Sequence, residues 1–252
     1  MIGARRGVFV AWAVVLVALA ASIGANVFLA HAIVDYVQTD DTVRLDPAGL
    51  DVHASERAKP IEPGPPIVEF FGDSRIAMWT EPVVPGYRTV NRGIGRQTTT
   101  QLLLRFDAEV TATHPAVVVL EGGVNDLKTI AEFPERRAEI VARCKTNLTA
   151  LVDRSRRAGA QVVLVTIFDI GDVALWRKPF WSPDIEAAVR EVNAFLPELT
   201  GDKVVLFDAS AALDAPPGEI RHDFQLDHLH LKAPGYAALN ERLVPLLVSL
   251  PR

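Results

Sequence analysis

The fold is decided by the stretch Ile67-Val68-Glu69-Phe70-Phe71-Gly72-Asp73-Ser74, in which a mostly apolar run of five residues leads into Gly-Asp-Ser. A short apolar run that ends at glycine is typical of a strand buried on both faces, and such strands occur in parallel sheets. In parallel α/β sheets, ligands bind just beyond the carboxyl ends of the strands. The stretch therefore predicts an α/β domain with a functional group at Ser74.

Four further apolar runs follow along the chain, at residues 89–91, 116–120, 161–167 and 203–207. Between and after them, residues 98–113, 134–158, 183–199 and 234–250 have apolar side chains at helical spacing. Alternating strands and helices form a sheet covered by helices on both faces. We therefore predict a three-layer α/β/α domain with a five-stranded parallel sheet.

The N-terminus carries a long apolar segment. No charged residue occurs from Gly7 to Val34, whereas about 20 apolar residues suffice to cross a bilayer. Arg5 and Arg6 precede the segment and acidic residues follow it, which places the N-terminus in the cytoplasm. We expect residues 1–36 to be a single-pass anchor in the cell membrane, with the rest extracytoplasmic. A cleaved signal peptide is the alternative, because small residues near Ala32 suit a peptidase, and the protein would then be secreted.

Residues 37–66 are polar and rich in proline, so we expect an extended linker, followed by one folded domain over residues 67–252. The formal net charge is −5, and charges of both signs are mixed along the domain. This pattern offers no basic face for nucleic acid. The single cysteine, Cys144, excludes an intramolecular disulfide.

Glycine and asparagine follow the second and third predicted strands, in Asn91-Arg92-Gly93-Ile94-Gly95-Arg96 and in Gly122-Gly123-Val124-Asn125-Asp126. Glycines allow backbone N–H groups to approach a ligand, and the Asn125 amide can stabilise a negative oxygen. Together with the N–H of Ser74 they would form an oxyanion hole. The alternative is that they are ordinary turn residues. Their coincidence with Ser74 at three successive strand ends favours a site.

Near the C-terminus, Asp227-His228-Leu229-His230 precedes the last predicted helix. A neutral imidazole at His230 can remove the proton of Ser74, and Asp227 can orient that imidazole. Alternating side chains point to opposite sides, so we expect His228 to face solvent.

Several side chains in this region are also possible metal ligands for zinc or manganese: His222, Asp223, Asp227, His228 and His230. A metal site would leave Ser74 and Asn125 without a role. We therefore expect no metal, and a solvated polar loop is the remaining alternative.

Together these segments resemble the sequence blocks of the GDSL/SGNH hydrolase family, named for a serine, a glycine, an asparagine and a histidine. Gly72-Asp73-Ser74 resembles the nucleophile block, Gly123-x-Asn125-Asp126 the third block and Asp227-x-x-His230 the last block. The resemblance spans Ile67 to the C-terminus. It implies a flavodoxin-like sheet, ester hydrolysis through an acyl-serine intermediate, and no metal or organic cofactor.

The second block, which is Asn91 to Arg96 in this chain, departs from the family pattern. Family members commonly place the oxyanion glycine five positions after the asparagine, where this chain has Arg96. We assign Gly95 as the family glycine, and the N–H of Arg96 is the alternative donor. The expected oxyanion hole is then Ser74, Gly95 and Asn125.

The segment after the fourth strand, residues 169–182, contains Trp176, Phe180 and Trp181. We expect Trp176 and Trp181 to contact the acyl chain or a sugar ring of the substrate; packing of the loop onto the core is the alternative. The predicted function is a membrane-anchored serine esterase acting on an O-acyl glycan, a lysolipid or a small ester. An acyltransferase with the same residues and a non-catalytic glycan- or lipid-binding domain stay open as alternatives.

Overall fold

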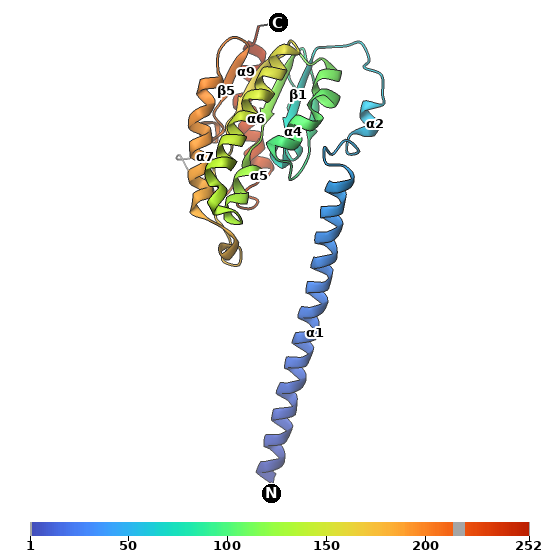
Figure 1. Ribbon diagram of the computed structural model, residues 1–252, viewed down its shortest axis with the longest axis vertical. Coiled ribbons are helices and arrows are strands. Elements are labelled where there is room, and N and C mark those ends of the chain that lie inside the picture. The colour runs from blue at the N-terminus through green and yellow to red at the C-terminus, as the bar shows by residue number, and fades with distance from the viewer. Residues whose placement is uncertain (1, 214–219, 252) are drawn as a thin grey trace. The chain divides into compact units, whose positions relative to one another are not determined.

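The computed structural model describes residues 2–213 and 220–251 and divides the chain into two units, Met1–Pro47 and Ala48–Arg252 (Figure 1). The first unit is the helix α1 (Ile2–Leu45). The second unit contains the strands β1 (Ile67–Gly72), β2 (Arg88–Gly93), β3 (Val117–Glu121), β4 (Gln161–Val165) and β5 (Val204–Phe207). Its α-helices are α2 (Ala54–Arg57), α3 (Ser74–Ala77), α4 (Thr99–Phe106), α5 (Val124–Leu127), α6 (Arg137–Arg157), α7 (Pro183–Phe195), α8 (Ala209–Ala212) and α9 (Ala233–Ser249).

The five strands form one parallel sheet in the order β2-β1-β3-β4-β5, which confirms the predicted sheet. In the centre, Phe71 of β1 pairs with Arg92 of β2 on one side and with Leu120 of β3 on the other. The chain runs from β1 to one neighbour and then back to the other. Ligands bind at such a reversal, and here the loops after β1 and β3 flank it.

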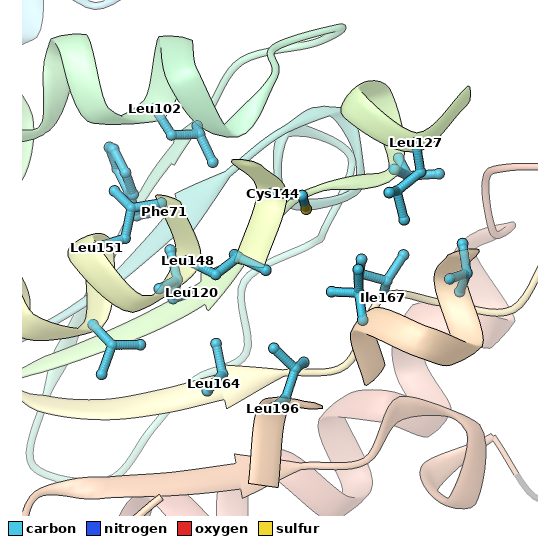
Figure 2. Packing of buried hydrophobic residues seen from close by; sticks show 14 of the residues in the cluster. Phe71, Leu102, Leu120, Leu127, Cys144, Leu148, Leu151, Leu164, Ile167 and Leu196 are labelled. Carbon is cyan, nitrogen blue, oxygen red and sulfur yellow. The ribbon is translucent and has the colours of Figure 1, made fainter. Parts of the chain in front are cut away.

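Helices cover both faces of the sheet, as the three-layer prediction requires (Figure 1). On one face, α4, α6 and α7 pack against β1, β3 and β4, and Figure 2 shows Phe71, Leu120, Leu148 and Leu151 in this layer. On the other face, α9 packs over the strand residues that point the opposite way, including Phe70. This division follows from the alternation of side chains along a strand.

All four predicted helices differ from the observed ones at their ends. Residues Pro134–Arg136, before α6, and Leu196–Leu199, after α7, form 3₁₀ turns. The helix expected over residues 98–113 is α-helical only to Phe106 and continues as a π-helical turn, Asp107–Thr111. The helix expected over residues 234–250 is α9, which begins one residue earlier, at Ala233.

Helix α1 continues to Leu45, and the residues between Ala48 and β1 belong to the same unit as the sheet. Within this unit Arg57 forms an ion pair of 2.7 Å with the fully buried Glu109, and His53 lies 3.5 Å from the same carboxylate. A buried carboxylate requires such cations. Proline content alone could not reveal this need.

Helix α1 is long and apolar enough to cross a membrane over its segment Gly7–Leu45. A signal sequence near an N-terminus meets the same criterion. The structure therefore contains the predicted apolar helix at the N-terminus.

Close backbone packing connects the end of β2 to the turn that carries Ser74. A Cβ atom on Gly93 would lie 2.1 Å from the backbone nitrogen of Ala77. The Asn91 side chain reinforces this contact by donating to the carbonyl oxygens of Ile76 and Trp79, at 2.8 and 3.1 Å. The serine turn is thus seated directly on β2.

We therefore predict that Gly93→Ala destabilises the fold. The added methyl group meets backbone atoms that have no room to move, and overpacking of this kind costs roughly 1–3 kcal/mol or more. Urea unfolding of the full chain in mild non-ionic detergent measures the loss. Gly64→Ala is the matched control, because the nearest atom to its Cβ would be the Glu62 carbonyl oxygen at 3.9 Å. Equal midpoints for the two variants would contradict the prediction.

A buried carboxyl group lies in the middle of β1. Glu69 is fully buried and accepts a hydrogen bond from the Thr113 hydroxyl. Burial raises the pKa of Glu69 from 4.5 to about 8, although Thr113 and the charge of Arg92 act in the opposite direction. The native protein therefore retains this proton in a pH range where the unfolded chain has lost it.

It follows that Glu69 lowers stability as the pH rises through this range, because the native state binds more protons than the unfolded state. Glu69→Gln keeps an acceptor for Thr113 but cannot ionise. We expect the difference between the free energies of unfolding, variant minus wild type, to increase between about pH 5 and about pH 8. The increase should be on the order of 2–4 kcal/mol. Urea titrations at each pH measure the difference. Parallel pH profiles for the two proteins would disprove the assignment.

Candidate active site

Each residue of Gly72-Asp73-Ser74 has a structural reason for its position. A Cβ atom on Gly72 would lie 2.1 Å from the Glu121 carbonyl oxygen, so β1 approaches β3 too closely for any side chain there. Asp73 is the N-cap of α3, and its carboxylate accepts the N–H of Arg75 at 2.9 Å. These constraints place Ser74 as the first residue of α3, partly exposed at the end of the sheet.

The structure brings Ser74, His230 and Asp227 together, although Ser74 and His230 are 156 positions apart. Ser74 Oγ lies 2.8 Å from His230 Nε2, and His230 Nδ1 lies 2.9 Å from Asp227 Oδ2. The backbone N–H groups of Leu229 and His230 also donate to Asp227 Oδ1, at 2.7 and 2.9 Å. A serine, an imidazole and a carboxylate in series have the geometry of a catalytic triad.

The electrostatics of Asp227 suit a charged partner for the imidazole. Burial by itself would raise the pKa of Asp227, but the hydrogen bonds from the His230 side chain and from the Leu229 N–H outweigh it, so the pKa is lowered. Asp227 is therefore a carboxylate at neutral pH. A carboxylate on Nδ1 keeps the proton there and leaves Nε2 free to accept the proton of Ser74.

Asn125 lies in α5, immediately after β3. Gly123 before it has a φ of 122°, a conformation that L side chains rarely adopt, and its Cβ would lie 2.9 Å from Cys144 Sγ. The Asn125 Nδ2 group donates to the Gln97 carbonyl oxygen at 3.0 Å and lies 3.3 Å from Asp73 Oδ2. The amide is thus fixed between the second block and the nucleophile block.

Asp126 connects the third block to the start of α4. Its carboxylate accepts the N–H of Thr99 at 2.8 Å and the Thr99 hydroxyl at 2.6 Å. Burial raises the pKa of Asp126, against the lowering effect of these hydrogen bonds. The role of Asp126 in the motif is therefore structural: it ties the loops after β2 and β3 to each other.

The second block passes close to the nucleophile. A Cβ atom on Gly95 would lie 3.9 Å from Ser74 Cβ, the only heavy atom that it would meet within 4 Å. The left-handed conformation falls on the next residue, because Arg96 has a φ of 69°. Glycine is favoured in that region, so Arg96 has the backbone conformation expected at the position where the family commonly has glycine.

A buried charge network behind Ser74 escaped the sequence analysis. Arg75, Asp73 and Glu121 are fully buried, and Arg75 Nη1 lies 3.5 Å from Glu121 Oε1. Arg75 Nε donates to the Leu229 carbonyl oxygen at 3.0 Å. Leu229 lies between Asp227 and His230 in the chain. The only sequence signal was an arginine directly after the candidate nucleophile.

The protonation of this network follows from its burial. Burial raises the pKa of Glu121 well above its ordinary value, and the nearby negative charge of Asp73 raises it further. With Glu121 protonated, Asp73 and Arg75 balance each other. The network is therefore close to neutral, which a buried group of charges requires.

The aromatic residues of the loop after β4 separate into two kinds. Trp181 packs edge-on against the His228 ring at 4.9 Å, and its Nε1 donates to Glu186 at 2.8 Å. Trp176 is 70% exposed, with the Arg177 guanidinium 4.5 Å from its ring centre. Loop packing therefore accounts for Trp181, whereas Trp176 is free for other contacts.

His228 does not face solvent, contrary to the sequence expectation. It is 5% exposed, and Gly171 donates its N–H to the His228 carbonyl oxygen at 3.0 Å. Burial lowers the pKa of His228, although the charge of Asp227 acts in the opposite direction. Alternation of side chains could not show that the loop after β4 covers this ring.

The metal ligands considered in the C-terminal loop have other partners. His222 lies 3.7 Å from Asp172, and Asp223 forms a 2.6 Å ion pair with Arg221. Within residues 2–213 and 220–251, no group of three or more His, Cys, Asp or Glu side chains is arranged to hold a metal ion.

Comparison with known proteins agrees with this geometry. The model of the GDSL-like Lipase/Acylhydrolase family matches residues 70–238. A GDSL-like lipase from Bacteroides thetaiotaomicron VPI-5482 superposes with a TM-score of 0.60 at 20% identity, over 79% of this chain and 98% of that chain. A catalytic mutant of the acetylxylan esterase Axe2 from Geobacillus stearothermophilus gives 0.54 at 20% identity, over 76% and 98%. At these identities the likeness shows the fold.

Among curated proteins, the chain is 32% identical over 81 residues to the uncharacterized lipoprotein YqeF of Bacillus subtilis (strain 168). The match spans about a third of that relative's length, 32%, and the same share of this chain. The family model is more extensive, because it includes the serine turn, the loop after β3 and the Asp227-x-x-His230 segment. On that match, the chain belongs to the GDSL-like lipase/acylhydrolase family of ester-hydrolysing enzymes.

Proposed function

We propose that the protein is a membrane-anchored, extracytoplasmic serine esterase in which Ser74 is the nucleophile, His230 the general base and Asp227 the orienting carboxylate. The observation that carries the proposal is the 2.8 Å contact between Ser74 Oγ and His230 Nε2, with Asp227 on the other ring nitrogen. A serine activated by an adjacent base can hydrolyse an ester through an acyl-serine intermediate.

In the first step His230 Nε2 takes the Ser74 proton while Oγ attacks the carbonyl carbon of the ester, giving a tetrahedral oxyanion. The C–O bond to the alcohol then breaks, and the alcohol leaves with the proton from His230. In the second step His230 takes a proton from water, which attacks the acyl-serine. Collapse of the second oxyanion releases the carboxylic acid and returns the proton to Ser74.

Three donors surround the position of the oxyanion in this mechanism: the Ser74 N–H, the Asn125 amide and an N–H of the second block. The Asn125 amide donates to the Gln97 carbonyl oxygen at 3.0 Å and, through a longer bond of 3.3 Å, to Asp73 Oδ2; in the transition state the oxyanion would replace Asp73 as the acceptor of the second bond. For the third donor, the left-handed conformation of Arg96 favours its N–H over that of Gly95. Gly95, the residue before Arg96, adjoins Ser74, because a Cβ atom on it would lie 3.9 Å from Ser74 Cβ.

Arg75 is assigned a positioning role. It touches no reacting atom, but its bond to the Leu229 carbonyl holds the loop that carries Asp227 and His230 against the turn that carries Ser74. Its guanidinium is further confined by the Phe168 ring, 4.8 Å away. Because this loop is held in place, the base His230 loses little entropy when the transition state forms.

The proposed location follows from α1. A retained helix, with Arg5 and Arg6 on the cytoplasmic side, would anchor the enzyme with its catalytic domain outside the cytoplasm. The lipoprotein name of the Bacillus subtilis relative also supports a site at the cell envelope.

The proposed substrates at the envelope are O-acyl glycans, lysolipids and small esters, and the likeness to an acetylxylan esterase supports the first of these. Exposed Trp176 is the proposed substrate contact, whereas Trp181 would act mainly by holding its loop against His228.

The first test is labelling of the detergent-solubilised full chain with a fluorophosphonate probe, followed by peptide mapping. We expect a single modified residue, Ser74, no labelling in Ser74→Ala, and labelling slowed by roughly 10²–10⁴-fold in His230→Ala, since general-base catalysis contributes about that factor. Ser210→Ala is the serine control, because Ser210 is hydrogen-bonded to Asp169 outside the triad. Undiminished labelling of Ser74→Ala in a folded sample would overturn the proposal.

A second prediction concerns the oxyanion hole. Asn125→Ala should lower kcat by about 10²–10³-fold with a small effect on KM, because the lost donor acts mainly in the transition state. Steady-state kinetics on any ester that the enzyme turns over measure the change. Asn240→Ala is the control: it also removes a side-chain amide, one that bonds Trp79 and Thr80 away from the triad. If kcat of Asn125→Ala equals that of the control, Asn125 has no part in the mechanism.

A further inference from the structure

Three cationic side chains come from segments that adjoin the triad. Arg96 follows Gly95, which adjoins Ser74, and precedes Gln97, whose carbonyl binds Asn125. Lys128 directly follows α5, the helix that carries Asn125. Arg177 belongs to the loop that is fastened to His228 through Trp181. The positive charges thus come from the loops after β2, β3 and β4, the same sheet edge as Ser74.

These cations are not balanced by the fold. Within the described parts of the chain, the side chains of Arg96, Lys128 and Arg177 form no ion pair and no hydrogen bond, and the Arg177 guanidinium contacts only the Trp176 ring. By contrast, exposed Arg143 on α6 is paired with Glu139. Arg96 and Arg177 are exposed, whereas Lys128 is partly buried, so its charge is desolvated without an anion to compensate it.

Arg96 and Arg177 both act electrostatically on Lys128. Burial lowers the pKa of Lys128, and the positive charges of Arg96 and Arg177 lower it further, against Asp73 and Glu132. Arg177 and Lys128 also contribute to the lowered pKa of His228, which is next to Asp227. Like charges gathered at a catalytic edge destabilise the free protein, and such arrangements are common at functional sites.

The net charge of the chain contrasts with the positive charge of this cluster. The formal net charge is −5, so the protein as a whole repels anions. A local group of three cations beside the nucleophile would reverse this effect at the one place where a substrate must bind. A guanidinium group can donate two parallel hydrogen bonds to two oxygens of a phosphate or carboxylate, and an ammonium group adds a point charge.

We propose that the enzyme prefers esters that carry a negative charge, a phosphate or a carboxylate, and that Arg96, Lys128 and Arg177 bind this group. The inference rests on the proposed ester hydrolysis and narrows its substrate class. Two sources supply such a group at a cell envelope: the headgroup of an acylated phospholipid, and the uronate of an acylated glycan.

The test compares two matched pairs of esters on the full chain in non-ionic detergent. The first pair is butyrylglycerol and butyrylglycerol 3-phosphate; the second is methyl O-acetylglucoside and O-acetylglucuronate. For the anionic member of one pair we expect kcat/KM to exceed that of its neutral partner by roughly tenfold at low salt, a preference that fades as salt screens the charges. The preferred pair identifies the source as a lipid headgroup or a glycan.

Variants connect the preference to the cluster. Lys128→Gln and Arg177→Gln should each reduce the ratio of anionic to neutral kcat/KM by about fivefold, mainly through KM of the anionic ester, because the lost charge acts in binding. Arg143→Gln is the control for loss of a surface charge and should leave the ratio at its wild-type value. A ratio near one at all salt concentrations, or a ratio that Lys128→Gln and Arg177→Gln leave unchanged, would overturn the inference.

A binding readout covers esters that are turned over too slowly to measure. The anionic member of a pair should protect Ser74 from the fluorophosphonate probe at a lower concentration than the neutral member, and equal protection would also overturn the inference. If Ser74 is not labelled at all in folded protein, the esterase proposal fails first. If Ser74 is labelled and neutral esters are preferred, only the inference about charge fails.

Discussion

The hydrogen bond between Ser74 Oγ and His230 Nε2 is the contact on which the rest of the arrangement depends. This bond supports catalysis only if Ser74 and His230 are both held in position, because a misplaced base loses much of its effect. At one end, Gly72 allows β1 to run close to β3, and Asp73 caps the turn. At the other end, two backbone N–H groups and the His230 ring converge on Asp227.

Arg75 joins these two ends. Its backbone N–H binds Asp73 and its side chain binds the Leu229 carbonyl, so one residue contacts both the serine turn and the histidine loop. Burying a guanidinium is costly, and here the charge of Asp73 offsets part of the cost. Because burial keeps Glu121 protonated, the network behind the nucleophile stays nearly neutral while the catalytic edge in front of it carries unpaired positive charge.

Positions without side chains matter as much as the charged ones. Gly93 and Gly123 lie where a methyl group would collide with Ala77 and with Cys144, respectively. Both glycines occur where a loop after a strand must pass another segment at contact distance. Arg96 is the exception, a non-glycine residue in the left-handed region. Such a conformation costs free energy, and its retention beside a nucleophile is typical of functional sites.

The sequence by itself determined the α/β architecture, because short apolar runs that alternate with segments of helical spacing are typical of a parallel sheet between helices. It also pointed to Ser74, Asn125, Asp227 and His230, since polar residues that follow strands gather at one edge. Only the tertiary structure decided that residues 48–57 join the domain, that His228 is buried under Trp181, and that Arg75 spans the site. These features depend on which distant segments meet, as Glu109 does with Arg57. Local periodicity carries no information about such pairings, because it records which face a side chain occupies and not what it faces.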